Sequence, residues 1–217
     1  MISPLTGLYV ITPDQPLAQY REQLLTVLRA RPALLQYRRK NVSDACRLEE
    51  ARSIQALMHT LAASEALPPV PLIINDALWL AETLGCGLHL GQGDGSLSEA
   101  RQRLGPNAII GRTCHQSQAL AEQAIAEGAS YLAFGAVYPS RTKPLATRID
   151  PSDLLALIQQ VSRESQHPVC AIGGLQPENA QVVRAAGAQL LAVSQDIWSR
   201  QGEALSDRLA EWRRVFL

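Results

Sequence analysis

Residues 8–35 of the chain read LYVITPDQPLAQYREQLLTVLRARPALL, and this stretch contains one full repeat of the pattern that decides the fold. Leu8–Ile11 and Ala33–Leu35 are short apolar runs typical of buried strands, and Leu17–Leu28 between them has the apolar spacing of a helix. Strand, helix and strand in such short steps predict two parallel strands joined by a crossover helix.

The same alternation continues along the chain and predicts eight strand–helix units. The further apolar runs are Val70–Ile74, Gly87–Leu90, Ala108–Ile110, Tyr131–Phe134, Val169–Ile172 and Leu190–Val193, with helical spacing at Ala45–Leu61 and Ala119–Ala126 among others. Eight units in 217 residues favour an α/β fold with one domain over residues 1–217, a (β/α)8 TIM barrel. A doubly wound open sheet is the alternative, because hydrophobic periodicity does not report whether a sheet closes.

Composition excludes several classes of protein. Lys and Arg together number 20, as do Asp and Glu, so the formal net charge is zero and a basic nucleic-acid surface is not expected. No segment is long and apolar enough for a membrane span, and the opening MISPLTGLYVIT does not resemble a signal peptide. We expect reduced thiols and a cytoplasmic location, without zinc or disulfides, because the cysteines are far apart: Cys46, Cys86, Cys114 and Cys170.

Polar residues follow the apolar runs, and in a barrel the ends of all strands meet on the face that carries the active site. After the second run, alternation puts Gln36, Arg38 and Lys40 on one side of the chain. Two cations on a shared face can hold a diphosphate, Arg through a planar fork and Lys as a point charge. A solvated basic turn is the alternative interpretation.

Two carboxylates follow the third and fourth runs. Asn75 and Asp76 come after the third, and Asp94 follows the fourth. Two Asp residues on neighbouring strand ends can together bind Mg²⁺, which takes carboxylates, water and phosphate oxygens. The alternatives are a helix N-cap for Asn75-Asp76 and a glycine-rich turn for Asp94. We interpret His89, at the end of the fourth run, as a hydrogen-bonded structural residue.

The fifth run leads to Thr113, whose hydroxyl can bind an anion or cap the next helix. Cys114 and His115 follow directly, but adjacent residues of a strand point to opposite faces, which argues against a nucleophilic dyad.

The longest irregular stretch is Gly135–Ile149, and long loops in compact domains are usually functional. Gly173-Gly174 after the seventh run lets backbone N–H groups approach an anion, near Ser194 after the eighth. A tight turn with positive φ is the alternative for the glycine pair. Three residues of the long stretch can wrap a phosphate: Ser140, Thr142 and Lys143.

The candidate face holds carboxylates, cations, hydroxyls and glycines, but no poised nucleophile or base. It therefore favours chemistry driven by stabilising a leaving diphosphate. Taken together, these segments resemble the thiamine-phosphate synthase family over nearly the whole chain. The segments are LYVIT at 8–12, QYRRK at 36–40, PLIIND at 71–76, GLHLGQGD at 87–94, FGAVYPSRTKP at 134–144, AIGGL at 171–175 and AVS at 192–194.

The resemblance implies a magnesium-dependent transferase of alkyl or aryl groups. Such enzymes join 4-amino-2-methyl-5-hydroxymethylpyrimidine diphosphate to 4-methyl-5-(2-hydroxyethyl)thiazole phosphate and release pyrophosphate. Pyrophosphate is expected to leave first, giving a cation stabilised by the aminopyrimidine ring, which the thiazole nitrogen then attacks.

The resemblance also assigns roles to residues. Asp76 and Asp94 are implied as Mg²⁺ ligands, and the catalytic cations are Arg38, Lys40 and Lys143. The implied pyrimidine-diphosphate ligands are Gln36, Arg38, Lys40 and Asn75, with Lys143 as a further pyrophosphate ligand. Thr113 is implied as a substrate-binding residue. The implied thiazole-phosphate ligands are Ser140, Thr142, Gly174, Val193 and Ser194.

Three positions depart from the family pattern. Thr113 stands where Ser is usual, and keeps the hydroxyl. Arg39 replaces an acidic or otherwise polar residue, and Arg112 an apolar one. These added cations are expected either to tighten diphosphate binding or to lie in solvent.

Two other functions remain open from the sequence. A related thiazole tautomerase shares this type of barrel but carries His where this chain has Ala136. A catalytically silent, phosphate-binding regulator is the second, although anion binding alone does not require both carboxylates. The expected partners are small-molecule substrates, without nucleic acid or membrane, and a homo-oligomer is left open.

Overall fold

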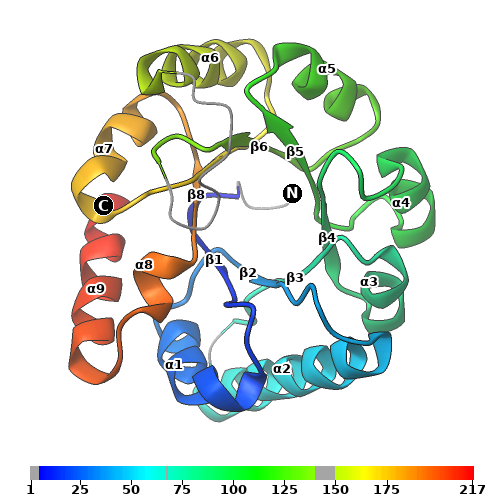
Figure 1. The fold of residues 1–217 in the computed structure, drawn as a ribbon, viewed down its shortest axis with the longest axis vertical. Helices are drawn as coiled ribbons and strands as arrows, with labels where there is room; N and C mark the ends of the chain where they lie inside the picture. Colours follow the sequence, from blue (N-terminus) through cyan, green and yellow to red (C-terminus); the bar gives the residue numbers. More distant parts are fainter. Residues whose placement is uncertain (1–4, 67, 140–149) are drawn as a thin grey trace.

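The computed structural model describes residues 5–66, 68–139 and 150–217, and its centre is a closed parallel barrel. Eight strands pair in chain order, and β1 closes the ring against β8, with Gly7 opposite Leu190 (Figure 1). The predicted (β/α)8 barrel is confirmed, and the open-sheet alternative is wrong. The strands are β1 Gly7–Ile11, β2 Leu34–Tyr37, β3 Leu72–Asn75, β4 Gly87–Leu90, β5 Ile110–His115, β6 Tyr131–Gly135, β7 Val169–Ile172 and β8 Leu190–Val193.

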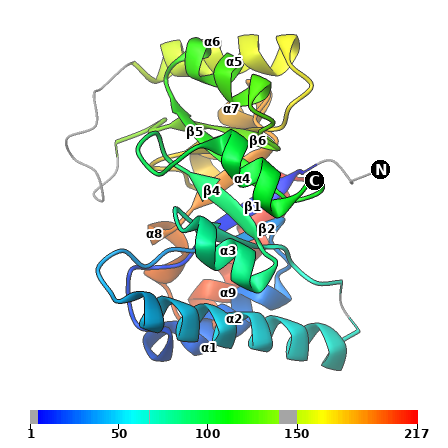
Figure 2. The same cartoon turned by 90° about the vertical axis from the view of Figure 1, so that its right-hand side faces the viewer.

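Helices form an outer ring around the strands, as Figures 1 and 2 show. The three helices that the spacing predicted begin and end within a few residues of the expected positions. Two helices instead of one follow β8 in the described residues, and the short α8 lies inside the ring formed by the others (Figure 1). The helices are α1 Leu17–Arg29, α2 Asp44–Ser64, α3 Leu78–Leu84, α4 Leu97–Leu104, α5 Gln118–Ala126, α6 Pro151–Glu164, α7 Pro177–Ala185, α8 Gln195–Trp198 and α9 Gly202–Val215.

Capping residues explain where several helices begin. The side chains of Ser43, Ser96 and Ser117 each accept a hydrogen bond from a backbone N–H in the first turn of α2, α4 and α5. Asp150 does the same for α6, which has Pro151 at its first position. These caps place the start of each helix directly after the loop at a strand's carboxyl end, so they fix the loops that carry the candidate site.

Side-chain alternation along the strands produces two cores. The larger core lies between the strands and the helices, and the smaller one fills the barrel interior. The interior core contains two tyrosines, Tyr9 and Tyr131, among aliphatic residues. Gly111 makes room for Tyr131, because a Cβ at this position would lie 2.4 Å from the Tyr131 hydroxyl oxygen.

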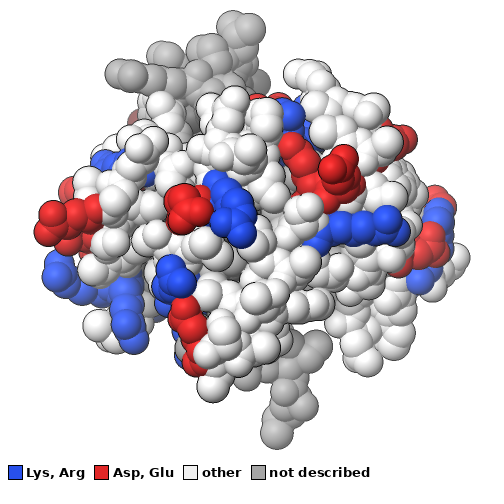
Figure 3. Space-filling view, turned by 90° about the horizontal axis from the view of Figure 1, so that it is seen from below, with Lys and Arg blue, Asp and Glu red and all other residues white. Residues whose placement is uncertain are grey.

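The charged surface fits the balanced composition. Acidic and basic side chains are interspersed on the face shown in Figure 3, rather than gathered by sign. The described part of the chain contains no helix of the length and apolarity that a membrane span requires.

Candidate active site

The site begins with polar side chains on the inner side of four consecutive strands, near their carboxyl ends. Gln36 lies on β2, Asn75 ends β3, His89 is on β4 and Thr113 is on β5. Adjacent strands bring them together, since Asn75 pairs with His89 in the strand register and the His89 Nε2 lies 2.9 Å from the Thr113 Oγ1. These residues therefore line one sector of the barrel mouth.

Two carboxyl groups meet just above this sector. Asp76 follows β3 with a positive φ of 64°, and its carboxyl is a close neighbour of the Asp94 carboxyl in the loop after β4. The pKa of Asp76 is raised, first by burial and then by the Asp94 carboxyl, while Lys40 acts in the opposite direction. The Lys40 Nζ lies 3.4 Å from Asp76 Oδ2, and the Gly91 N–H donates to Asp94 Oδ2 over 2.9 Å.

The carboxyls of Asp76 and Asp94 could together hold a divalent cation. Two carboxylates forced together repel each other, and a shared cation relieves the repulsion. The residues described contain no group of three or more His, Cys, Asp or Glu side chains that could hold a metal. That is compatible with Mg²⁺, which is commonly bound by one or two carboxylates together with water and substrate phosphates. Asp76 and Asp94 also border a hollow of about 340 Å³ between α3 and α4.

The adjacent residues Arg38 and Arg39 have different surroundings. The Arg38 guanidinium is partly exposed, and its nearest carboxylate oxygen, on Asp14, is 4.0 Å away. Arg39 is nearly buried and donates to Glu50 Oε2 over 3.1 Å and to Asp14 Oδ1 over 3.2 Å. Arg39 therefore fastens this loop to α2, and Arg38 remains the cation available to an anionic ligand.

Arg112 is also structural. It is only 8% exposed, and its Nη1 donates to the Gly95 carbonyl over 3.0 Å. The Gln92 side chain donates to the Thr113 carbonyl from the same β4–α4 loop. Two hydrogen bonds thus tie the loop carrying Asp94 to β5. The expectation that the added cations lie in solvent is wrong for Arg112 and Arg39, because each is bound by protein acceptors. These contacts also occupy donors that a diphosphate would need.

The expectation that His89 is a hydrogen-bonded structural residue agrees with its contacts. Its Nδ1 lies 2.9 Å from the Tyr131 hydroxyl, in addition to the bond between its Nε2 and Thr113. Cys114 is buried, and burial raises the pKa of its thiol to about 12, while His115 is exposed. The Cys114–His115 pair is therefore no activated nucleophile, as the strand alternation predicted.

Two glycines shape the loop after β7. Gly173 and Gly174 have φ of 106° and 60°, so the tight-turn interpretation is correct. A Cβ on Gly174 would also lie 2.7 Å from the Tyr138 Cβ in the loop after β6. The Tyr138 N–H donates to the Gly173 carbonyl over 3.0 Å, so the two loops are bound together.

The end of β8 is held by a buried ion pair. Val193 is buried, and Ser194 is the N-cap of α8. Asp196 in α8 pairs with Arg208 of α9, whose Nη2 lies 2.8 Å from Asp196 Oδ1, and both side chains are less than 10% exposed. The Trp212 Nε1–H donates to Asp196 Oδ2 over 2.7 Å. Because β7 and β8 are neighbours, Gly174 and Ser194 lie on adjacent strand ends.

Three predicted site residues, Ser140, Thr142 and Lys143, lie outside the described residues. The sequence interpretation did not single out Tyr9, Tyr131 or Asp14. The alternation of side chains along a strand could have identified the two tyrosines. Each lies in a short apolar strand at a position whose side chain faces the barrel interior. Nothing local in the sequence marks Asp14, which binds residues far along the chain.

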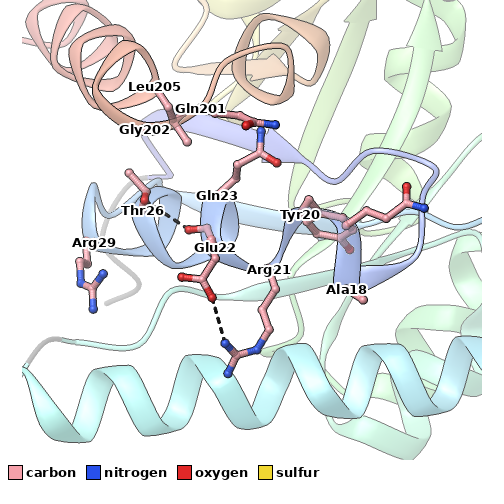
Figure 4. Close-up of a pocket in the computed structure, with 11 residues that line it drawn as sticks. Ala18, Tyr20, Arg21, Glu22, Gln23, Thr26, Arg29, Gln201, Gly202 and Leu205 are labelled. Atoms are coloured by element: carbon pink, nitrogen blue, oxygen red, sulfur yellow. Dashed lines mark hydrogen bonds and ion pairs between the residues drawn. The ribbon is translucent and has the colours of Figure 1, made fainter.

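A second hollow, also of about 340 Å³, lies between α1 and the start of α9 (Figure 4). Its polar residues include the exposed pair Arg21 and Glu22, and none of the predicted site residues lines it. The chemistry points to the strand ends rather than to this hollow.

A closed (β/α)8 barrel with paired carboxylates, cations and a glycine turn at its strand ends defines a class of enzymes that act on phosphorylated substrates. A family model described as thiamine monophosphate synthase matches residues 8–197. The chain is 44% identical over 214 residues to thiamine-phosphate synthase of Aromatoleum aromaticum, covering 98% of this chain and 97% of that one. It is also 44% identical to the Thioalkalivibrio sulfidiphilus protein of the same name, covering 95% and 94%.

Solved structures agree with these relatives. Thiamine phosphate pyrophosphorylase from Pyrococcus furiosus superposes with a TM-score of 0.78 at 25% identity, covering 97% of this chain and 95% of that one. A 3-hexulose-6-phosphate synthase, at 12% identity and a TM-score of 0.66, shares the fold. The chain belongs to the thiamine monophosphate synthase family. These matches support neither the thiazole tautomerase nor the silent regulator.

Proposed function

We propose that this protein is a thiamine-phosphate synthase. It joins 4-amino-2-methyl-5-hydroxymethylpyrimidine diphosphate to 4-methyl-5-(2-hydroxyethyl)thiazole phosphate and releases pyrophosphate. The observation that carries the proposal, within a chain of this family, is the contact of Asp76, Asp94 and Lys40 at the ends of neighbouring strands. Paired acidic groups beside a cation suit a metal-bound diphosphate better than a lone phosphate.

The diphosphate end of the first substrate is assigned to Arg38, Lys40, Asn75 and Lys143. Asp76 and Asp94 would hold Mg²⁺, which would offset the charge of the departing pyrophosphate. The cationic side chains add donors where negative charge grows as the carbon–oxygen bond breaks, and this favours the transition state over the bound substrate. Gln36 and Thr113 face the pyrimidine ring from inside the barrel.

The second substrate is assigned to the opposite sector of the mouth. Gly174, Val193 and Ser194 surround its phosphate, with Ser140 and Thr142 from the loop after β6. Backbone N–H groups of a glycine turn can approach a phosphate closely, and loops after the seventh and eighth strands of such barrels often bind phosphate. The thiazole nitrogen attacks the carbon that loses pyrophosphate, and this step requires no proton transfer to a protein base.

The wider setting is also part of the proposal. We assign residues 1–217 to one barrel domain working in the cytoplasm. Free thiols at all four cysteines support a reducing compartment, and two of them are buried where oxidation would disrupt the core.

A turnover assay with both substrates tests the function. Purified protein with Mg²⁺ should form thiamine phosphate and pyrophosphate in equal amounts, and a chelator should stop the reaction. Conversion of one thiazole tautomer into another without condensation would favour the tautomerase. Phosphate binding with neither product would favour the regulator.

A further inference from the structure

Four hydrogen bonds cross the barrel interior and connect Gln36 on β2 with Thr113 on β5. The Gln36 Nε2 donates to the Tyr9 hydroxyl over 2.6 Å, and the Tyr9 and Tyr131 hydroxyl oxygens are 2.8 Å apart. The Tyr131 hydroxyl lies 2.9 Å from His89 Nδ1, and His89 Nε2 lies 2.9 Å from Thr113 Oγ1. We call these five residues the interior chain.

The middle of the interior chain is isolated from water. Tyr9 is 1% exposed and Tyr131 is fully buried, their rings are edge to face, and His89 stacks on Tyr131. Burial raises the pKa of both phenols, so each keeps its single proton. The close approach of Gly111 to the Tyr131 ring leaves that ring no room for a side chain beside it.

For a neutral His89 imidazole, counting protons gives the direction of the interior chain. Each phenol has one proton, and a neutral imidazole has one N–H. Since the Gln36 amide donates to Tyr9, Tyr9 must donate to Tyr131 and Tyr131 to His89 Nδ1. The His89 proton then lies on Nε2 and is donated to Thr113. Reversing one bond alone would leave a donor facing a donor, an acceptor facing an acceptor, or a phenol proton without an acceptor, which is costly in a dry interior.

Both ends of the interior chain are thereby polarised. The side-chain amide oxygen of Gln36, Oε1, accepts no hydrogen bond from a described side chain, and the proton of Thr113 Oγ1 is not used by His89. We propose that Tyr9, Tyr131 and His89 are positioning residues that set substrate specificity, by holding Gln36 as a hydrogen-bond acceptor and Thr113 as a donor toward the bound ring.

This inference rests on the proposed function and sharpens it. A pyrimidine with a 4-amino group offers Gln36 a donor, whereas a 4-oxo pyrimidine offers an acceptor. In a site where the amide cannot rotate, the wrong pairing leaves two acceptors facing each other. The interior chain should therefore select the amino ring at the binding step, independently of the chemistry that follows.

Binding of unreactive ligands tests the selection. The probes are 4-amino-2-methyl-5-hydroxymethylpyrimidine monophosphate and its 4-oxo counterpart, titrated by calorimetry. Wild-type protein should prefer the amino form by at least about 30-fold. In Tyr9→Phe and Tyr131→Phe the Gln36 amide is free to rotate, and the preference should fall to roughly threefold or less.

Tyr37→Phe is the matched control. It also removes a buried tyrosine hydroxyl, bonded to Glu50 Oε2 over 2.8 Å, but on the outer side of β2. It should keep the wild-type preference. An unchanged preference in both interior variants, with Tyr37→Phe behaving alike, would overturn the proposal.

The tautomer of His89 gives a second readout that needs no ligand. In ¹⁵N spectra, with His89 assigned from a His89→Asn sample, the proton should lie on Nε2. A proton on Nδ1 in the wild-type protein would mean that the hydrogen bonds of the interior chain run in the opposite direction. That result would refute the assignment of Gln36 as an acceptor toward the ring. Failure of turnover with an Nε2 proton would instead count against the proposed function alone.

Discussion

At the scale of single residues, substitutions of two adjacent arginines should affect different properties, one activity and the other stability. Arg38→Met removes a charge-assisted contact to the diphosphate, so kcat/KM should fall by roughly 10- to 100-fold with little change in melting temperature. Arg39→Met leaves Glu50 largely buried without its cation, which should cost about 3 kcal/mol of stability. Steady-state kinetics and thermal unfolding of both variants measure the contrast. Loss of activity in Arg39→Met alone would contradict it.

The carboxylate pair gives a second prediction at this scale. In Asp94→Asn the amide oxygen can still accept from the Gly91 N–H, but one of the two repelling charges is gone. We expect the melting temperature in chelator to be unchanged or higher. Burial first, and then the Asp94 carboxyl, raises the pKa of Asp76, and the substitution removes the second of these causes. The rise in melting temperature that Mg²⁺ gives the wild-type protein should disappear.

Asp207→Asn, on the exposed side of α9, serves as the control for the metal effect. It should keep the response to Mg²⁺. An equal response in Asp94→Asn and wild-type protein would remove Asp94 from the metal site.

At the scale of elements, the ion pair between α8 and α9 should matter for both stability and binding. Arg208→Met leaves Asp196 buried with less compensation, at a cost of about 3 kcal/mol, and loosens the helix that begins at Ser194. The KM for thiazole phosphate should then rise more than that for the pyrimidine. Arg103→Met, which removes exposed pairs with Glu82 and Glu99, should leave the melting temperature nearly unchanged, because solvent screens such pairs.

The β4–α4 loop offers a similar comparison. Arg112→Met removes the bond to the Gly95 carbonyl, so Asp94 is less firmly placed and the Mg²⁺ concentration for half-maximal rate should rise about fivefold or more. Arg101 also binds backbone carbonyls, including that of Gly128, but away from the strand ends that carry the site. Arg101→Met should lower stability without changing the Mg²⁺ requirement. Equal effects on that requirement would contradict the role of Arg112.

At the scale of the whole molecule, the two substrates should respond to different variants. Lys143→Ala removes a contact that strengthens as pyrophosphate leaves, so the loss should fall mainly on kcat. Gly174→Val should raise the KM for thiazole phosphate most. Since Gly174 also packs on Tyr138, Ser194→Ala provides a variant of the same sub-site without backbone strain. If Lys143→Ala changed only the thiazole-phosphate KM, the two sub-sites would be exchanged.

Most of the barrel could be predicted because aliphatic runs and helical spacing are local signals. The predicted run Ala108–Ile110 covers only the start of β5, which extends to His115 through the polar residues Arg112 and Thr113. Hydrophobicity does not mark a strand whose polar side chains find acceptors on neighbouring loops. Closure also could not be derived, because it depends on contacts between the first and last strands.

The neighbouring positions of Asp76 and Asp94 could be predicted, because each follows one of two adjacent strands; their role as metal ligands stays a prediction. The site was not predictable where a partner is distant in the chain. From the sequence alone, Arg39 and Arg112 look like surface cations. Their hydrogen bonds to Glu50 and to the Gly95 carbonyl become apparent only in the fold. The link from Gln36 through Tyr9 to Tyr131 likewise requires three strands to be placed around one interior.

The pairing of β1 with β8 has a consequence for how the protein folds during translation. Gly7 finds its partner at Leu190, so β1 keeps one open edge until almost the entire chain has been translated. An open strand edge can pair with other chains, and a growing polypeptide exposes it for the whole of synthesis. Once the ring closes, all eight strands are paired on both sides and that hazard ends. Pairing with β8 thus protects the finished enzyme from edge-to-edge association. The nascent chain has to rely on chaperones or on rapid folding after translation.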